Sequence, residues 1–200
     1  MQTIQNLLQK EAEAILNIPV SDSYFGAVDL IYQAVHVRHG KVVTSGMGKA
    51  GQVAVSIATT FCSTGTPAVN LHPAEAQHGD LGVIQPNDIL LLVSNSGRTR
   101  EVLELLALAH RLYENLPVIV ITSNAESELA KQADIALYTG RPAELCPLGL
   151  TPTASTTVMG VMGDILVVEL MKKIGFNNEE YAKRHHGGYL GEKSRNQTIR

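Results

Sequence analysis

The spacing of apolar and polar positions divides the chain into alternating helical and extended segments. Two helical patterns come first, at about residues 2–17 and 22–38, and apolar residues recur in the second at intervals of three and four. Short β-rich runs then alternate with helical spacing. The pattern predicts strands at 41–45, 67–71, 88–94, 118–122 and 135–138, and further helices at 49–63, 98–113, 126–132 and 154–173.

Strands that alternate with helices are typical of βαβ units and a mainly parallel sheet. The runs at 88–94 and 118–122 are continuously apolar, as expected for strands buried on both faces. No linker or repeat divides the chain. We predict one α/β domain in three layers, with a helical N-terminus at about 1–40, a core at 41–175 and a C-terminal part at 176–200. Ligands should bind in the loops after the strands.

Composition narrows the function mainly by exclusion. The 200 residues are 44% hydrophobic and 18% charged, which suits a folded domain. A net charge of −3 and the absence of Trp argue against a nucleic-acid-binding surface. No run of 18 apolar residues and no secretory signal occurs, so we expect a cytoplasmic protein without a membrane span. The two cysteines, Cys62 and Cys146, fit a reducing compartment, and we expect them to pack rather than react.

The loop at 45–51 connects a predicted strand to a helix and carries three glycines with the GxGxxG spacing of dinucleotide-binding proteins. The next predicted strand does not end in the Asp or Glu that would bind a ribose. The loop is not a P-loop either, because Ala50 follows Lys49 where Ser or Thr is required. Dinucleotide binding and a plain strand-to-helix turn both remain open from these residues alone.

The loop at 94–99 follows the most apolar strand and opens a helix. It places Ser94, Ser96 and Thr99 around a glycine, next to the free amides of a helix N-terminus. Hydroxyls, amides and the helix dipole together favour a phosphate, whereas an ordinary N-cap needs only one hydroxyl. No second basic cluster is present, so we expect a monophosphate rather than a polyphosphate.

Three other polar groups each allow a structural and a functional interpretation. The loop at 72–82 contains His72, His78 and two carboxylates, which suit a structural loop or a catalytic histidine better than a metal site. Glu144 is a single carboxylate in a proline-rich stretch; burial would raise its pKa toward neutrality and suit a general base, although an ordinary surface glutamate is the alternative. His185 and His186 precede two glycines, as in a helix C-cap or a group that reaches a neighbouring subunit.

Six motifs in order resemble the sugar isomerase (SIS) domain of D-arabinose 5-phosphate isomerases. They are GMGKAG, STGTP, LHPAEAQHGDLG, SNSGRTREV, AELCPLGLTPTASTT and HHGG, between residues 46 and 188. The resemblance implies a five-stranded parallel sheet and a homotetramer that shares active sites between subunits. It also implies an enediol interconversion of D-ribulose 5-phosphate and D-arabinose 5-phosphate, without a cofactor, that supplies Kdo for lipopolysaccharide.

The family's functional residues can be transferred to matching positions. The resemblance assigns catalysis to five residues: Lys49, His78, Glu101, Glu144 and His185. Phosphate binding falls on Ser94, Ser96 and Thr99, and Ser45, His72 and His186 are further candidates. Which glutamate is the base stays open, and HHGG in place of the usual HPGG leaves the choice between the two histidines open.

Two departures from the family bear on function. Arg98 stands where the family usually has Glu, which adds positive charge beside the expected phosphate. The pair of CBS domains that commonly follows the isomerase domain is absent from these 200 residues, so we expect a bare isomerase domain. A non-catalytic phosphosugar-binding module and an isomerase for another sugar phosphate are the alternatives.

Overall fold

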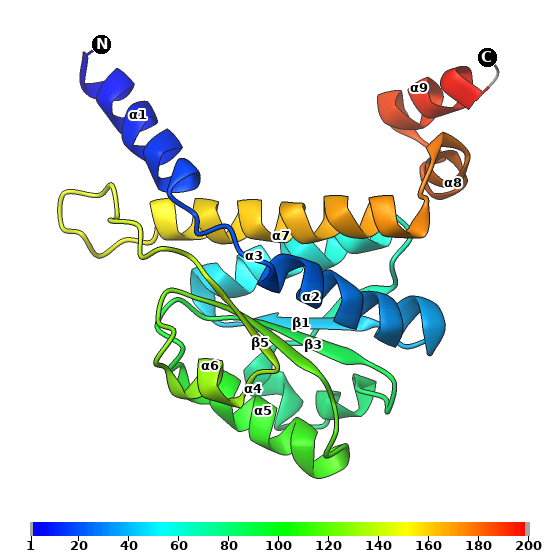
Figure 1. The fold of residues 1–200 in the computed structure, drawn as a ribbon, viewed down its shortest axis with the longest axis horizontal. Helices are drawn as coiled ribbons and strands as arrows, with labels where there is room; N and C mark the ends of the chain where they lie inside the picture. Colours follow the sequence, from blue (N-terminus) through cyan, green and yellow to red (C-terminus); the bar gives the residue numbers. More distant parts are fainter. Residues whose placement is uncertain (1, 199–200) are drawn as a thin grey trace.

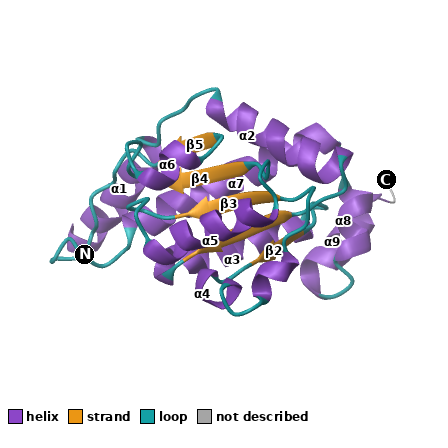
Figure 2. Cartoon of the chain, turned by 90° about the horizontal axis from the view of Figure 1, so that it is seen from below, coloured by secondary structure: helices purple, strands orange, loops and turns teal. Residues whose placement is uncertain are grey.

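Five parallel strands form a single sheet in the order β2-β1-β3-β4-β5, as Figures 1 and 2 show. The computed structural model describes residues 2–198. The strands are β1 (Val42–Gly46), β2 (Ala68–Asn70), β3 (Ile89–Val93), β4 (Val118–Thr122) and β5 (Ile135–Tyr138). The three central strands β1, β3 and β4 are completely buried, as the apolar runs at 88–94 and 118–122 predict for β3 and β4. The expected three-layer α/β fold with a five-stranded parallel sheet is confirmed.

Helices cover both faces of the sheet and create two apolar cores. One face carries α2 (Ser23–Ile31), α3 (Gly48–Ser63) and α7 (Ala154–Ile174), and the opposite face carries α4 (Pro73–Ala76), α5 (Arg100–Leu112) and α6 (Glu128–Gln132). Alternate residues of each strand point to opposite faces of the sheet. In β3, Leu91 and Val93 pack in the core under α2, α3 and α7, and Leu90 and Leu92 pack in the core under α4, α5 and α6. The helix after β1, α3, covers one face of the sheet, whereas the helix after the neighbouring strand β3, α5, covers the other.

The predicted elements agree with the structure except at a few positions. The helix expected at 22–38 becomes a π-helix after α2, over η1 (Tyr32–Val37). Two short helices lie where we expected only a polar loop, namely α4 and the 3₁₀ helix η2 (Asp80–Val83). Two C-terminal helices, α8 (Asn178–Arg184) and α9 (Gly188–Thr198), flank the histidine pair.

Helix α7 lies across the outside of the first core, and the terminal helices project from its two ends (Figure 1). Its length and composition would allow it to cross a membrane, but half of its most apolar stretch is buried inside the domain. Core helices of water-soluble domains satisfy the same criterion, and α7 packs against α2, α3 and the sheet. We therefore interpret α7 as a core helix. Helix α1 (Gln2–Leu16) packs against it but contains no buried residue.

Candidate functional site

The carboxyl ends of β1 and β3 create the site, because the chain leaves them toward opposite faces of the sheet. Gly46 pairs with Val93 at the very end of the two strands, so the loops that follow start side by side. Helix α3 begins from the first loop and α5 from the second. Ligands of doubly wound sheets bind in this kind of crevice. The structure thus brings Lys49, in the first turn of α3, to the same edge as the loop at 94–99.

The loop after β3 is a compact arrangement of hydroxyl groups. The Ser94 and Thr99 hydroxyls lie 2.8 Å apart, and the Gly97 amide donates to Ser94 Oγ at 3.2 Å. Ser96 Oγ accepts from the Arg98 amide at 3.2 Å. Thr99 is the N-cap residue of α5, yet its side chain does not cap the helix. The alternative of an ordinary N-cap is therefore wrong for Thr99. Its hydroxyl instead lies within hydrogen-bond distance of the Ser94 hydroxyl, beside the first amides of α5.

The remaining candidates after β1 and β2 differ in their roles. Ser45 is buried, and its hydroxyl donates to the Leu71 carbonyl at 2.6 Å, which ties the ends of β1 and β2 together. His72 and His78 are exposed at the two ends of α4. Gln77, next to His78, donates to Glu104 of α5 at 2.9 Å, so this segment packs beside the helix that carries Glu101.

Glu101 and Glu144 approach the edge from different strands. Glu101 is half-buried in the first turn of α5, and Glu144 is half-buried in the segment between β5 and α7. Neighbouring strands lie about 4.8 Å apart, so the ends of β3 and β5 are separated by roughly 10 Å. Both glutamates therefore lie along the same edge of the sheet as the hydroxyl loop.

Our expectation for the pKa of Glu144 is wrong. Partial burial raises the pKa of this carboxyl, but hydrogen bonds from Ser155 and Thr153 together outweigh burial and hold it below its usual value. Glu144 Oε2 accepts from the Thr153 amide at 2.7 Å and the Thr153 hydroxyl at 2.9 Å. It also accepts from the Ser155 amide at 3.4 Å. The carboxylate thus binds the N-terminus of α7, which sequence spacing did not reveal.

His185 lies far from these residues within one chain. It is the C-cap of α8, beyond the opposite end of α7 from Glu144, and a helix of 21 residues spans about 30 Å. His186 is exposed in the same connection. The structure therefore does not bring either histidine to the edge that carries Ser94 and Lys49.

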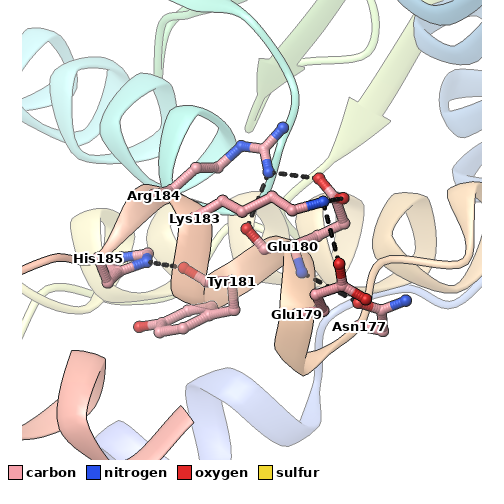
Figure 3. Close-up of polar contacts among 7 residues, drawn as sticks. All are labelled: Asn177, Glu179, Glu180, Tyr181, Lys183, Arg184 and His185. Atoms are coloured by element: carbon pink, nitrogen blue, oxygen red, sulfur yellow. Dashed lines mark hydrogen bonds and ion pairs between the residues drawn. The ribbon is translucent and has the colours of Figure 1, made fainter. Parts of the chain in front are cut away.

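The His185 ring is nevertheless held in a defined orientation. Its Nδ1 lies 3.0 Å from the Tyr181 carbonyl, as Figure 3 shows, and its ring stacks on the Tyr181 ring at 3.7 Å between centroids. A carbonyl can only accept, so Nδ1 carries the hydrogen and Nε2 is the acceptor when the ring is neutral. Phe176 packs edge-on against Tyr181, and Arg184 lies over Phe176.

Comparison with known protein families shows which family has this fold and sequence. A family model of the SIS domain matches residues 37–169, which include the sheet and most of α7. The chain belongs to the SIS domain family. The expected resemblance is thereby confirmed.

Curated relatives of this SIS chain are named arabinose 5-phosphate isomerase KdsD. The relative from Yersinia pestis is 47% identical over 186 residues, which are 93% of this chain and 55% of the relative. The relative from Escherichia coli K12 is 49% identical over 154 residues, 77% of this chain and 46% of the relative. The chain therefore spans about half the length of the curated relatives it matches.

Solved structures of SIS proteins include two close matches. A proposed phosphosugar isomerase involved in capsule formation in Bacteroides fragilis is 65% identical, with a TM-score of 0.93, and the match covers 94% of this chain and 98% of the other. A protein of E. coli CFT073 in complex with arabinose 5-phosphate is 32% identical, with a TM-score of 0.84, and the match covers 91% of this chain and 95% of the other.

Several residues that support this SIS site escaped sequence reasoning. Asn124, after β4, donates to the Ser96 carbonyl at 3.4 Å. Arg141, after β5, has a left-handed backbone with φ of 56° and donates through Nε to the Ser123 carbonyl at 2.9 Å. These loops meet only in the folded sheet, so their positions in the sequence carry no signal of the contact. A left-handed arginine is uncommon, and here it directs the guanidinium toward the loops of the site edge.

The cysteines differ from our expectation, since neither is buried. Cys62 is exposed, and its thiol donates to the Ala68 carbonyl at 3.1 Å. Hydrogen bonds from Thr151 and Leu150 to the sulfur lower the pKa of Cys146 to about 7. A lowered pKa increases the thiolate fraction of Cys146 near neutral pH.

Proposed function

We propose that this SIS chain is an aldose–ketose isomerase that interconverts D-ribulose 5-phosphate and D-arabinose 5-phosphate. The observation that carries the proposal is the hydroxyl loop Ser94–Thr99 at the switch point, with Lys49 and Glu101 at the same sheet edge. The names of the relatives support this substrate, and so does the solved structure in complex with arabinose 5-phosphate. The product would supply Kdo for lipopolysaccharide in the cytoplasm.

The phosphate end of the substrate would anchor the reaction. The hydroxyls of Ser94, Ser96 and Thr99 and the first amides of α5 can donate to the phosphate oxygens, and the helix dipole favours the negative charge. Anchoring the substrate at one end holds its C1 and C2 in a fixed position, which is a large part of the rate acceleration in such reactions.

The chemistry requires proton transfer between C1 and C2. A carboxylate, Glu101 or Glu144, removes the proton from C1 of the ketose or C2 of the aldose, and the C–H electrons form the enediolate. The same group returns the proton to the neighbouring carbon, while the second glutamate or His78 moves a proton between O1 and O2. The Lys49 ammonium stabilises the developing oxyanion. The low pKa of Glu144 keeps it ionised, as a base must be before the step.

We further propose that the active enzyme is a homo-oligomer, and that His185 acts in the site of a neighbouring subunit. The distance of His185 from the site edge within one chain supports this arrangement. One stripe of α7 also supports it, because Val161, Ile165 and Val168 recur at helical spacing. Val168 is exposed, and Val161 and Ile165 are only partly buried. A homotetramer would satisfy both observations.

Incubation with ribulose 5-phosphate in deuterated water tests the reaction. We expect arabinose 5-phosphate that carries deuterium at C2, because the proton that the base returns exchanges with solvent. Mass spectrometry and proton NMR of the recovered sugars measure the product and the label. Unchanged ribulose 5-phosphate that still raises the melting temperature of the protein would contradict isomerisation and favour a phosphosugar-binding module.

Conservative replacement of the two glutamates tests the residue roles. We expect Glu101→Gln and Glu144→Gln each to lower kcat by at least about 100-fold, because an amide cannot accept the substrate proton. The side chain that replaces Glu144 retains an oxygen for the Thr153 and Ser155 amides, so the N-terminus of α7 should stay bound. Circular dichroism and melting temperature provide the folding control. Near-normal turnover in both variants would refute the assignment.

A further inference from the structure

Three successive carbonyl oxygens of the hydroxyl loop Ser94–Thr99 are bound by the chain that follows the neighbouring strand. We define this chain as the β4 segment, residues 122–129; β3 and β4 lie side by side in the sheet (Figure 2). The Asn95 carbonyl accepts from the Ser123 amide at 3.0 Å and from the Ser123 hydroxyl at 2.7 Å. The Thr122 hydroxyl is a third donor to it, at 3.2 Å. The Asn95 carbonyl therefore faces the β4 segment.

The next two carbonyls of the loop are bound from the same side. Asn124 Nδ2 donates to the Ser96 carbonyl at 3.4 Å, and the Leu129 amide, in α6, donates to the Gly97 carbonyl at 3.2 Å. A planar trans peptide points its N–H opposite to its C=O, so the amides of Ser96, Gly97 and Arg98 point away from the β4 segment. Carbonyl oxygens repel a phosphate, whereas amides attract it. The β4 segment thus binds the repelling groups and leaves the donors.

The amides of the loop meet its hydroxyl groups, as this geometry requires. The Gly97 amide donates to Ser94 Oγ and the Arg98 amide to Ser96 Oγ, both at 3.2 Å. The Ser96 amide has no acceptor within residues 2–198, and Ser96 is exposed. Successive backbone amides on one side of a turn form a concavity that binds anions. The Ser96 amide is therefore available to a phosphate oxygen.

Arg141, after β5, holds the β4 segment in turn. Its Nε donates to the Ser123 carbonyl at 2.9 Å, and its Nη2 lies 3.5 Å from Asn124 Oδ1. The Glu126 amide also donates to Asn124 Oδ1, at 3.2 Å. Both of these neighbours are donors, so the oxygen of the Asn124 side chain faces them and its Nδ2 is left for the Ser96 carbonyl. One guanidinium thus fixes two residues that bind the loop.

The backbone of Arg141 is strained, although the residue is exposed. Its φ of 56° lies in the left-handed region, which is unfavourable for a residue with a Cβ. Burial therefore does not explain the strain, whereas the contacts of the guanidinium do. Strained backbone that is retained in a folded protein often accompanies a functional constraint. Among the described residues other than glycine, only His39 shares a positive φ, at 61°.

We propose that Arg141 and Asn124 are positioning residues that keep the carbonyls of the hydroxyl loop away from a bound phosphate. Arg141 acts through Asn124 and Ser123 rather than on the ligand. Without the guanidinium, the Asn124 side chain can turn and the Ser96 carbonyl loses its donor. The peptide after Ser96 is then free to rotate its carbonyl toward the phosphate. The inference rests on the proposed binding of a phosphate monoester at Ser94–Thr99.

Arg141→Gly tests the proposal, because it removes the guanidinium and relieves the strained backbone at once. We expect the dissociation constant for inorganic phosphate, measured by isothermal titration calorimetry, to rise at least about fivefold, because the hydrogen bonds that orient the loop are lost. KM for ribulose 5-phosphate should rise by a similar factor while kcat changes less than about twofold, because the loop holds the phosphate and not the reacting carbons.

His39→Gly is the matched control. It relieves the same kind of backbone strain before the amino end of β1, at the edge of the sheet opposite the hydroxyl loop. The control should leave phosphate binding and KM unchanged. Arg141→Gly should lower the melting temperature no more than the control does, which separates loss of phosphate binding from loss of folding.

Two further variants distinguish positioning from direct charge attraction. Asn124→Ala should weaken phosphate binding as Arg141→Gly does, and the double variant should bind within about twofold of the weaker single variant, because both residues act in one series of contacts. Arg141→Lys retains the charge but lacks the planar fork of donors, so it should not restore binding. Additive losses in the double variant, or full binding by Arg141→Lys, would overturn the proposal.

Because phosphate binding is measured without turnover, the outcome separates the positioning role from the reaction. The expected losses of binding in a protein that does not convert ribulose 5-phosphate would refute the proposed function and leave the positioning role intact. An unchanged dissociation constant in Arg141→Gly, with normal turnover, would overturn the positioning role alone. A wild-type protein that binds no phosphate would overturn it as well, whatever the turnover.

Discussion

Residues of the hydroxyl loop Ser94–Thr99 are brought together by a backbone turn that the motif does not display. Ser94 and Thr99 are five residues apart, yet their hydroxyls lie within hydrogen-bond distance because Gly97 turns the chain at φ of 61°. A Cβ at Gly97 would overlap the Ser127 side chain, which comes from the loop after β4. The residue types were predictable from sequence, whereas the neighbour that makes glycine necessary was not.

Glycine is required at position 97 both for the positive φ and for the absence of a Cβ beside Ser127, and a matched pair of glycine variants separates these two requirements. Gly149 has nearly the same φ, 63°, but a Cβ there meets no atom within 4 Å. We expect Gly149→Ala to lower the free energy of unfolding by about 1 kcal/mol, because alanine is strained at positive φ. Gly97→Ala should lose roughly 1–3 kcal/mol more, because the added methyl also displaces Ser127. Urea unfolding measures both; equal losses would show that Ser127 does not restrict Gly97.

At the scale of elements, local pattern predicted most helices and strands but not their irregularities. The continuous apolar run of β4 has the same bounds in the sequence prediction and the structure, because burial on both faces requires apolar residues throughout. The π-helix η1 is such an irregularity; within it, His36 Nε2 lies 3.1 Å from Thr66 Oγ1, next to β2, and its ring stacks on Tyr32. Periodicity alone cannot detect such a contact.

The partly buried environment of His36 predicts acid-sensitive stability. Burial lowers the pKa of His36 in the folded state, so the unfolded chain takes up a proton at a higher pH than the folded protein. Stability contributed by neutral His36 is therefore fully present above pH ~6.5 and is lost as the pH falls below that value. We expect the wild-type protein to lose more stability between pH 7 and pH 5 than His36→Gln does.

Urea midpoints at the two pH values measure this difference. His39→Asn is the matched control, because His39 is exposed at positive φ and asparagine tolerates that backbone. The control should show the same pH dependence as the wild-type protein. An equal loss in the wild-type protein and His36→Gln would contradict a role of His36 in acid sensitivity.

At the scale of the whole molecule, the proposed sharing of the site between subunits can be tested by mixing variants. Mixing inactive His185→Ala with inactive Glu144→Gln should restore activity, because a mixed dimer contains one site with both residues intact. After subunit exchange, random pairing predicts about a quarter of wild-type turnover for a two-fold dimer. Turnover assays of the mixture against each variant alone measure it. No recovery, with subunit exchange verified by mass spectrometry, would show that both residues act within one chain.

By itself, the sequence determined the α/β class, the strands, the loops that carry the candidate site and the residue types of the turn proposed to bind phosphate. These follow from local periodicity and from the chemistry of residues close together along the chain. Only the tertiary structure decided that Glu144 binds the N-terminus of α7, that Arg141 supports the site edge and that His185 lies beyond the far end of α7. The physical reason is that these relations depend on strand order and on helix length and direction, which place side chains from distant segments together or apart.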